Sequence, residues 1–181
     1  MTKSILTLIL FISSLHINAQ IQSVKIVAAG LTCSMCSKAI YKSLTNISNV
    51  KNVESDIENS AYIVTFKDTT MVNPDALKSA VTDAGFSVAS MKINAIFHNK
   101  KISNDSHLLY EGLNLHFINV KEQILNGNIA ITITDKDFID KKSYKKNAAF
   151  TKSKCYKTGE KADCCKIENG ISNRVYHITL D

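Results

Sequence analysis

Seven residues, Gly30-Leu31-Thr32-Cys33-Ser34-Met35-Cys36, hold the most informative pattern in this chain. They follow an alternating apolar segment at 24–28, which is typical of a strand. They lead into apolar residues that recur at helical spacing, namely Cys36, Ile40, Leu44 and Ile47. The pattern predicts a strand, a tight turn, and a helix whose beginning carries two cysteines separated by two residues.

The segments that follow extend this beginning into a complete small fold. Alternation at 53–57 and β-branched and aromatic residues at 61–66 predict two further strands. Asn73 and Pro74 suit the start of a second helix, and Gly85 suits its end before a last strand at 86–91. The order βαββαβ over residues 20–93 predicts an α+β, ferredoxin-like domain, with two helices on one face of an antiparallel sheet.

The two cysteines suggest a metal site. Free N–H groups and the positive end of the dipole at a helix N-terminus favour thiolate over thiol, and thiolate is the form that binds metal. Two sulfur ligands suit a soft ion of low coordination number, Cu(I) or Hg(II). A structural zinc site normally has four protein ligands, and only two are local here. We therefore expect Cys33 and Cys36 to bind one soft ion.

Residues 21–93 resemble the heavy-metal-associated domain, a family of copper chaperones, domains of copper-exporting ATPases and the periplasmic mercury-binding protein. The family loop is usually Gly-Met-Thr-Cys-x-x-Cys; Gly30, Thr32, Cys33 and Cys36 match it, and Leu31 replaces the methionine. The resemblance implies that residue 31 packs beneath the loop instead of binding metal. It also implies that the aromatic residue after Gly85, Phe86, approaches the metal loop.

The remaining residues, 94–181, predict a small, mostly-β domain. Alternation is clear at 113–117, 129–134 and 175–180, and the charged segment 136–146 suits a short surface helix. A five-stranded barrel is one arrangement that this pattern allows. The histidines at 98, 107 and 116 show no metal-binding spacing, so we expect them on the surface or in loops.

A second group of cysteines lies near the C-terminus. Cys155, Cys164 and Cys165 fall close together, and His177 follows on the last predicted strand. A disulfide from Cys155 to Cys164 or Cys165 would close a loop of about ten residues and contribute about 2–3 kcal/mol. The alternative is a second soft-metal site formed by these thiolates with His177. Both interpretations stay open.

The N-terminus and the composition indicate export. Lys3, an apolar run at 5–12 and Ala19 before a polar residue predict a signal peptide over residues 1–19, and hence a periplasmic or secreted protein with no stable membrane insertion after cleavage. Hydrophobic residues make up 45% and charged residues 21% of the 181, which excludes a polytopic membrane protein or a disordered acidic chain. The net charge is +6, but the lysines at 141, 142, 145 and 146 have no interleaved aromatic residue other than Tyr144, which argues against a nucleic-acid-binding surface.

The sequence thus predicts an exported, non-enzymatic protein that binds one Cu(I) or Hg(II) ion and passes it on by ligand exchange. The expected partner is a metal-transporting ATPase or another domain with the same cysteine pair. The main alternative is a thiol–disulfide oxidoreductase using Cys33 and Cys36. The single proline opens a helix, which counts against it, because thioredoxin-like proteins place a cis-proline opposite the pair. A structural module with inert or paired cysteines is a weaker alternative.

Overall fold

The computed structural model describes residues 21–31, 34–67, 71–161 and 172–180. The predicted signal peptide lies outside these residues. The elements of the first half are β1 (Ile21–Ala29), α2 (Ser34–Thr45), β2 (Val50–Asp56), β3 (Ala61–Phe66), α3 (Pro74–Asp83) and β4 (Ser87–Ile102). The predicted βαββαβ order is confirmed.

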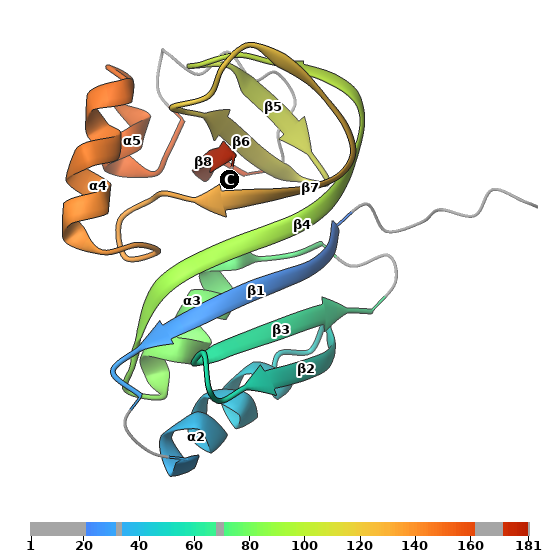
Figure 1. The fold of residues 1–181 in the computed structure, drawn as a ribbon, viewed down its shortest axis with the longest axis vertical. Helices are drawn as coiled ribbons and strands as arrows, with labels where there is room; N and C mark the ends of the chain where they lie inside the picture. Colours follow the sequence, from blue (N-terminus) through green and yellow to red (C-terminus); the bar gives the residue numbers. More distant parts are fainter. Residues whose placement is uncertain (1–20, 32–33, 68–70, 162–171, 181) are drawn as a thin grey trace, which may run out of the picture.

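The first half has the sheet and helix layers expected of a ferredoxin-like fold. Its strands lie in the order β2-β3-β1-β4, and every neighbouring pair is antiparallel. Helix α2 packs against β2 and α3, and α3 packs against β4, so both helices cover the same face (Figure 1).

Local chemistry explains where these elements begin and which side they bury. Val24 and Ile26 of β1 are fully buried and alternate with more exposed neighbours, as the period of a strand requires. The Asn73 side chain accepts a hydrogen bond from the backbone N–H of Ala76 at 3.1 Å, so it caps α3 directly before Pro74. The apolar face of α3 then lies on the sheet through Leu77, Ala80 and Val81.

Strand β4 joins the two halves of the chain. It has 16 residues and crosses the boundary predicted at 93/94. Its first part pairs with β1 and its later part with β7 (Gln123–Ile133), and Ile93 lies opposite both Val24 and Ile131. The result is one eight-stranded sheet in the order β2-β3-β1-β4-β7-β8-β6-β5 (Figure 1). The division into two domains stays a prediction.

In its described residues the second half adds four strands and two short helices. Besides β7 these are β5 (His107–Tyr110), β6 (Leu113–Phe117), α4 (Lys141–Asn147), a 3-10 turn (Ala148–Phe150), α5 (Cys155–Thr158) and β8 (Val175–Leu180). The strands predicted near 113, 129 and 175 are confirmed. The barrel is not, because the sheet is open, with β2 and β5 at its edges. Among the described residues β5 pairs only with β6 and not with β4, so the strands of this half do not close on themselves.

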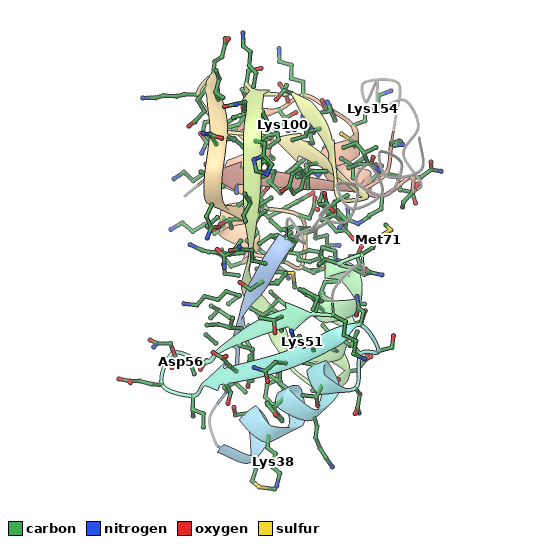
Figure 2. All side chains as sticks on the ribbon, turned by 90° about the vertical axis from the view of Figure 1, so that its right-hand side faces the viewer. Lys38, Lys51, Asp56, Met71, Lys100 and Lys154 are labelled. Atoms are coloured by element: carbon green, nitrogen blue, oxygen red, sulfur yellow. The ribbon has the colours of Figure 1, made fainter. Side chains whose placement is uncertain are left out.

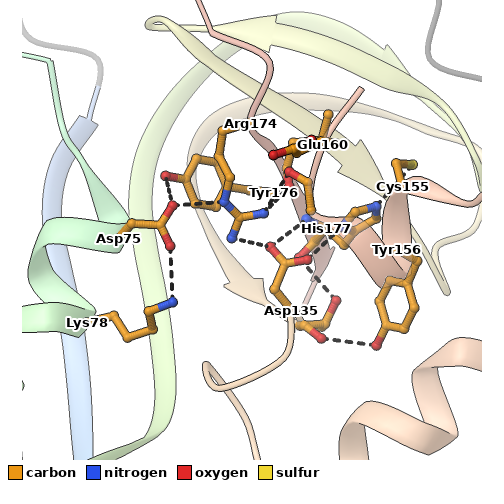
Figure 3. A network of polar contacts seen from close by, with 12 residues as sticks. Asp75, Lys78, Asp135, Cys155, Tyr156, Glu160, Arg174, Tyr176 and His177 are labelled. Atoms are coloured by element: carbon orange, nitrogen blue, oxygen red, sulfur yellow. Dashed lines mark hydrogen bonds and ion pairs between the residues drawn. The ribbon is translucent and has the colours of Figure 1, made fainter. Parts of the chain in front are cut away.

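A network of polar side chains also connects the halves (Figure 3). Arg174, which precedes β8, donates to Asp75 of α3 at 2.8 Å and to Asp135 at 3.2 Å. The Tyr176 hydroxyl donates to the same Asp75 carboxylate at 2.9 Å. Partial burial raises the pKa of Asp75, but the hydrogen bond and charge of Arg174, with the Tyr176 hydroxyl, outweigh it and hold that pKa below its usual value.

This network predicts a dependence of stability on pH. Because the pKa of Asp75 is lower in the folded protein, its ionised form stabilises the fold above about pH 4, and this contribution is lost as the pH falls through the folded pKa. We expect Asp75→Asn to lower the free energy of unfolding by about 1–3 kcal/mol at pH 7, and by progressively less below about pH 4. Urea unfolding at several pH values measures this difference.

The matched control for this prediction is Asp83→Asn, on the same helix and exposed to solvent. We expect that change to cost less than about 0.5 kcal/mol at any pH. A deficit of Asp75→Asn that stays constant down to pH 3 would contradict the assignment.

No helix in the described part of the chain is long and apolar enough to cross a membrane.

Candidate metal centre

The turn between β1 and α2 is shaped by a glycine and an aromatic ring. Gly30 has a φ of +86°, a backbone conformation that residues with a Cβ rarely adopt. A Cβ atom built at Gly30 would lie 4.0 Å from the Phe86 ring, so Phe86 is beside the start of the loop, as the resemblance implied. Leu31 is partly buried and packs against the core, which is the role expected for an apolar residue at this position. Thr32 and Cys33 lie outside the described residues.

Cys36 occupies the first turn of α2. Cys36 is half-buried, whereas the neighbouring Met35 is 73% exposed to solvent. The first turn of α2 contains no acidic residue, so no carboxylate opposes a thiolate there. The unpaired N–H groups and the dipole of the helix end stabilise negative charge at this place. The position of Cys36 therefore suits a thiolate ligand that a partner can reach.

The first turn of α2 is anchored to the sheet below it. The Ser37 and Tyr62 hydroxyl groups are hydrogen-bonded at 2.9 Å, and the Tyr62 hydroxyl donates to the Ser37 carbonyl oxygen at 3.2 Å. Both residues are buried, and Tyr62 lies on β3. Because Ser37 directly follows Cys36, these bonds fix the backbone that carries the cysteine.

Removal of this anchor should weaken both the fold and metal binding. We expect Tyr62→Phe to lower the free energy of unfolding by about 1–3 kcal/mol, because the buried Ser37 hydroxyl loses its partner. We expect affinity for Cu(I) to fall by up to about tenfold through the looser helix start. Urea unfolding and competition with a Cu(I) chelator measure the two effects. The more exposed Tyr41→Phe should change neither, and an unchanged Tyr62→Phe variant would contradict the anchor.

The second predicted group is brought together only in part. Cys155 in α5 and His177 in β8 are both fully buried, and the Cys155 Sγ lies 3.3 Å from the His177 Nε2. Cys164 and Cys165 lie outside the described residues. Neither the predicted disulfide nor the predicted four-residue site is therefore tested.

Two further histidines, which sequence reasoning placed on the surface or in loops, join this cluster. His116 is fully buried and its Nδ1 lies 3.6 Å from the Cys155 Sγ, so the prediction for His116 was wrong. Strand register explains the grouping: His107 of β5 lies opposite His116 of β6, which lies opposite His177 of β8. His107, His116 and Cys155 offer ligand atoms that all lie within 4.8 Å of one another.

Sequence spacing alone could not reveal the row of histidines. Residues 113–117 alternate as if only Leu113, Leu115 and Phe117 faced the core, but every residue of β6 is buried. The β6 strand is covered on both faces, so its polar positions also turn inward. The only signal was that His116 and His177 each stand between two apolar residues of a strand.

Carboxylates lie behind two of the histidines. The His116 Nε2 lies 3.1 Å from Asp105, and the His177 Nδ1 lies 2.6 Å from Asp135. Burial, with the neighbouring histidines, lowers the pKa of His116 to about 4, so its ring is neutral at physiological pH. Burial likewise lowers the pKa of His107.

Comparison with known proteins identifies the first half. The heavy-metal-associated domain family matches residues 25–87. The periplasmic component of a mercuric transport protein from Shigella flexneri is 32% identical over 68 residues, which cover 38% of this chain and 74% of that protein. The chain therefore belongs to the heavy-metal-associated domain family.

Solved structures of other proteins also match only a part of this chain. Oxidized MerP from Ralstonia metallidurans CH34 is 32% identical, covering 37% of this chain and 94% of that one, with a TM-score of 0.34. The CopZ metallochaperone is 27% identical, covering 37% of this chain and 98% of that one, also with a TM-score of 0.34. The heavy-metal-associated domain family and the mercuric transport component indicate metal binding and transport instead of catalysis, in agreement with the non-enzymatic role expected from the sequence.

Proposed function

We propose that this protein is an exported carrier that binds one soft metal ion, Cu(I) or Hg(II), through Cys33 and Cys36 and releases it to a partner. The observation that carries the proposal is the position of Cys36. It lies in the first turn of α2, within the residues that match the heavy-metal-associated domain. A mercuric transport component among the relatives supports a soft ion as the cargo.

Release would proceed by exchange of ligands at the metal. An attacking thiolate of the partner forms a new metal–sulfur bond, and the bond to one of the two cysteines of this chain then breaks. The ion keeps its oxidation state and the released thiolate takes up a proton from solvent. A site with two ligands at the surface permits this attack, whereas a closed four-ligand site does not.

The surface around the loop suggests which partner docks there. Helix α2 contains no acidic residue, and its Lys38 and Lys42 side chains are exposed; Figure 2 shows Lys38 at the end of the molecule that α2 forms. Met35 and Tyr41 add exposed apolar surface, 73% and 38% accessible. We propose that the partner presents a complementary acidic face, on a metal-transporting ATPase or on another domain with the same cysteine pair.

The place of action follows from the predicted signal peptide. We propose that residues 1–19 direct export, so the carrier works in the periplasm or outside the cell. The Shigella flexneri relative, a periplasmic component, supports this location. In an oxidising compartment a Cys33–Cys36 disulfide must be reduced before metal binds.

Anaerobic titration tests the carrier function. Reduced protein is titrated with Cu(I) in competition with a chromophoric chelator, and the bound ion is counted by native mass spectrometry. We expect the parent protein to retain one Cu(I) ion in the presence of the chelator. The double variant Cys33→Ser/Cys36→Ser should not retain it. No ion retained by the parent protein, together with catalytic reduction of a test disulfide, would favour the oxidoreductase instead.

A further inference from the structure

We propose that Cys155, His116 and His177, with His107 as a fourth ligand, form a second metal centre for a borderline divalent ion such as Zn(II) or Cu(II). One thiolate and several imidazoles are the donors that these ions prefer. The three histidines lie side by side on β5, β6 and β8, and α5 brings the thiol to the row. The sequence-based hypothesis had grouped Cys155 and His177 with Cys164 and Cys165 instead.

The distances between donor atoms fit a metal ion at the centre. In a tetrahedral zinc site the sulfur and nitrogen ligands lie about 3.5 Å from each other, given bonds of about 2.3 and 2.1 Å. The Cys155 Sγ lies 3.3 Å from the His177 Nε2 and 3.6 Å from the His116 Nδ1. These two distances match the spacing of ligands around one ion, whereas the His107 ring, stacked almost parallel on His116, has to turn out of that stack to bind the same ion.

The fourth position belongs to His107. Its ring stacks on His116, with centroids 4.0 Å apart. Its Nε2 is buried and has no hydrogen-bond partner among the described residues. A buried nitrogen without a partner is costly, and a metal bond would satisfy it.

Each of the two inner histidines is oriented by a carboxylate. The His116 Nε2 contacts Asp105, and the His177 Nδ1 contacts Asp135, so in both rings the other nitrogen faces the thiol. Metal-binding histidines are commonly held in this way, because the carboxylate fixes the ring and makes the ligand nitrogen more basic. Arg174 in turn holds Asp135, which extends the support to α3 of the first half (Figure 3).

Burial decides between a metal centre and a catalytic thiol. Cys155, His177 and Asp135 follow the order of a nucleophile, a base and an orienting carboxylate. However, the exposure of Cys155 and of His177 is 0%, so no substrate reaches the sulfur. A catalytic thiol needs only one base, so this role would leave His116 and His107 unexplained. A closed site of this kind holds a resident ion.

The second centre is separate from the metal loop. In Figure 1 α2 lies at one end of the molecule, and α5, β5, β6 and β8 lie at the other. The two sites also differ in chemistry, because the loop offers two thiolates and the cluster mainly imidazoles. This inference does not depend on the function proposed for the loop.

The test removes the loop ligands and uses Co(II) as the probe. The double variant Cys33→Ser/Cys36→Ser is reduced and titrated with Co(II), whose d–d and thiolate charge-transfer absorptions report the geometry and the sulfur ligand. We expect one ion with a tetrahedral spectrum, displaced by one equivalent of Zn(II). Further introduction of Cys155→Ser should remove the charge-transfer band and weaken binding more than about 100-fold, since changes behind the ligands already cost about 10–100-fold.

Matched variants separate the cluster from other ligands. His116→Gln should weaken binding like Cys155→Ser, whereas His98→Gln, at an exposed position on β4, should leave it unchanged. Asp135→Asn should weaken it by about 10–100-fold. Circular dichroism of each metal-free variant shows whether it is folded, and Zn(II) should raise the melting temperature only where the cluster is intact.

Three results would overturn the proposal. The first is that the double variant, reduced and folded, binds no Co(II). The second is that binding persists in Cys155→Ser or is instead removed by Cys164→Ser/Cys165→Ser. The third is a Cys155 disulfide that resists reduction in the folded protein. None of these results bears on Cu(I) binding by Cys33 and Cys36.

Discussion

Replacing Cys33 by serine should weaken Cu(I) binding at the loop more than about 100-fold. A two-ligand site loses half of its protein bonds in this variant, and even changes behind metal ligands cost about 10–100-fold. Serine is also a hard oxygen donor that a soft ion avoids. Cys36→Ser should have the same effect, and the two changes together should add little further loss. Competition with a Cu(I) chelator measures each affinity.

The matched control is Cys155→Ser, which removes a cysteine of the same chain far from the loop. We expect it to leave the loop affinity within about twofold, because sites without shared partners act independently. If the parent protein and Cys33→Ser bound Cu(I) with equal affinity, Cys33 would be excluded as a ligand.

The second large effect concerns the strand shared by the two halves. We expect Ile93→Ala to lower the free energy of unfolding by about 2–5 kcal/mol, the range for removing a buried aliphatic side chain. Ile93 is fully buried on β4 and lies opposite both Val24 and Ile131. The loss should therefore reach both halves. Hydrogen exchange of amides in β3 and in β8 measures it, and both sets should lose protection by the same factor.

The control for this prediction is Ile124→Ala, since that side chain is 64% exposed. We expect it to cost less than about 0.5 kcal/mol. If Ile93→Ala destabilised only β1, β2 and β3, the halves would be independent units and the domain boundary predicted at 93/94 would gain support.

The first half was predictable because its signals are local. The buried alternation of Val24 and Ile26, the cap at Asn73 and the turn at Gly30 each follow from neighbouring residues. Such signals agree with one another along the chain, and they fix the order of strands and helices. The family resemblance added the loop and the place of Phe86.

The second half was harder because its organisation depends on pairing between distant segments. The length of β4 could not be read from 87–102, since its exposed stretch at 98–101 resembles a loop. The parallel pairing of β6 with β8 joins residues about sixty positions apart, and only that register places His116 beside His177. A histidine on such a strand looks like a solvent-facing residue until the element that covers it is known.

The most direct test of the carrier account is transfer to an acceptor. Protein loaded with one equivalent of Cu(I) is mixed, without oxygen, with a metal-free domain of a copper-transporting ATPase that carries the same cysteine pair. Copper on each protein is then measured against time. If ligands exchange within a complex, the transfer rate rises with acceptor concentration and exceeds the rate of release into buffer. A rate independent of acceptor concentration, or copper that stays on the donor, would contradict the account.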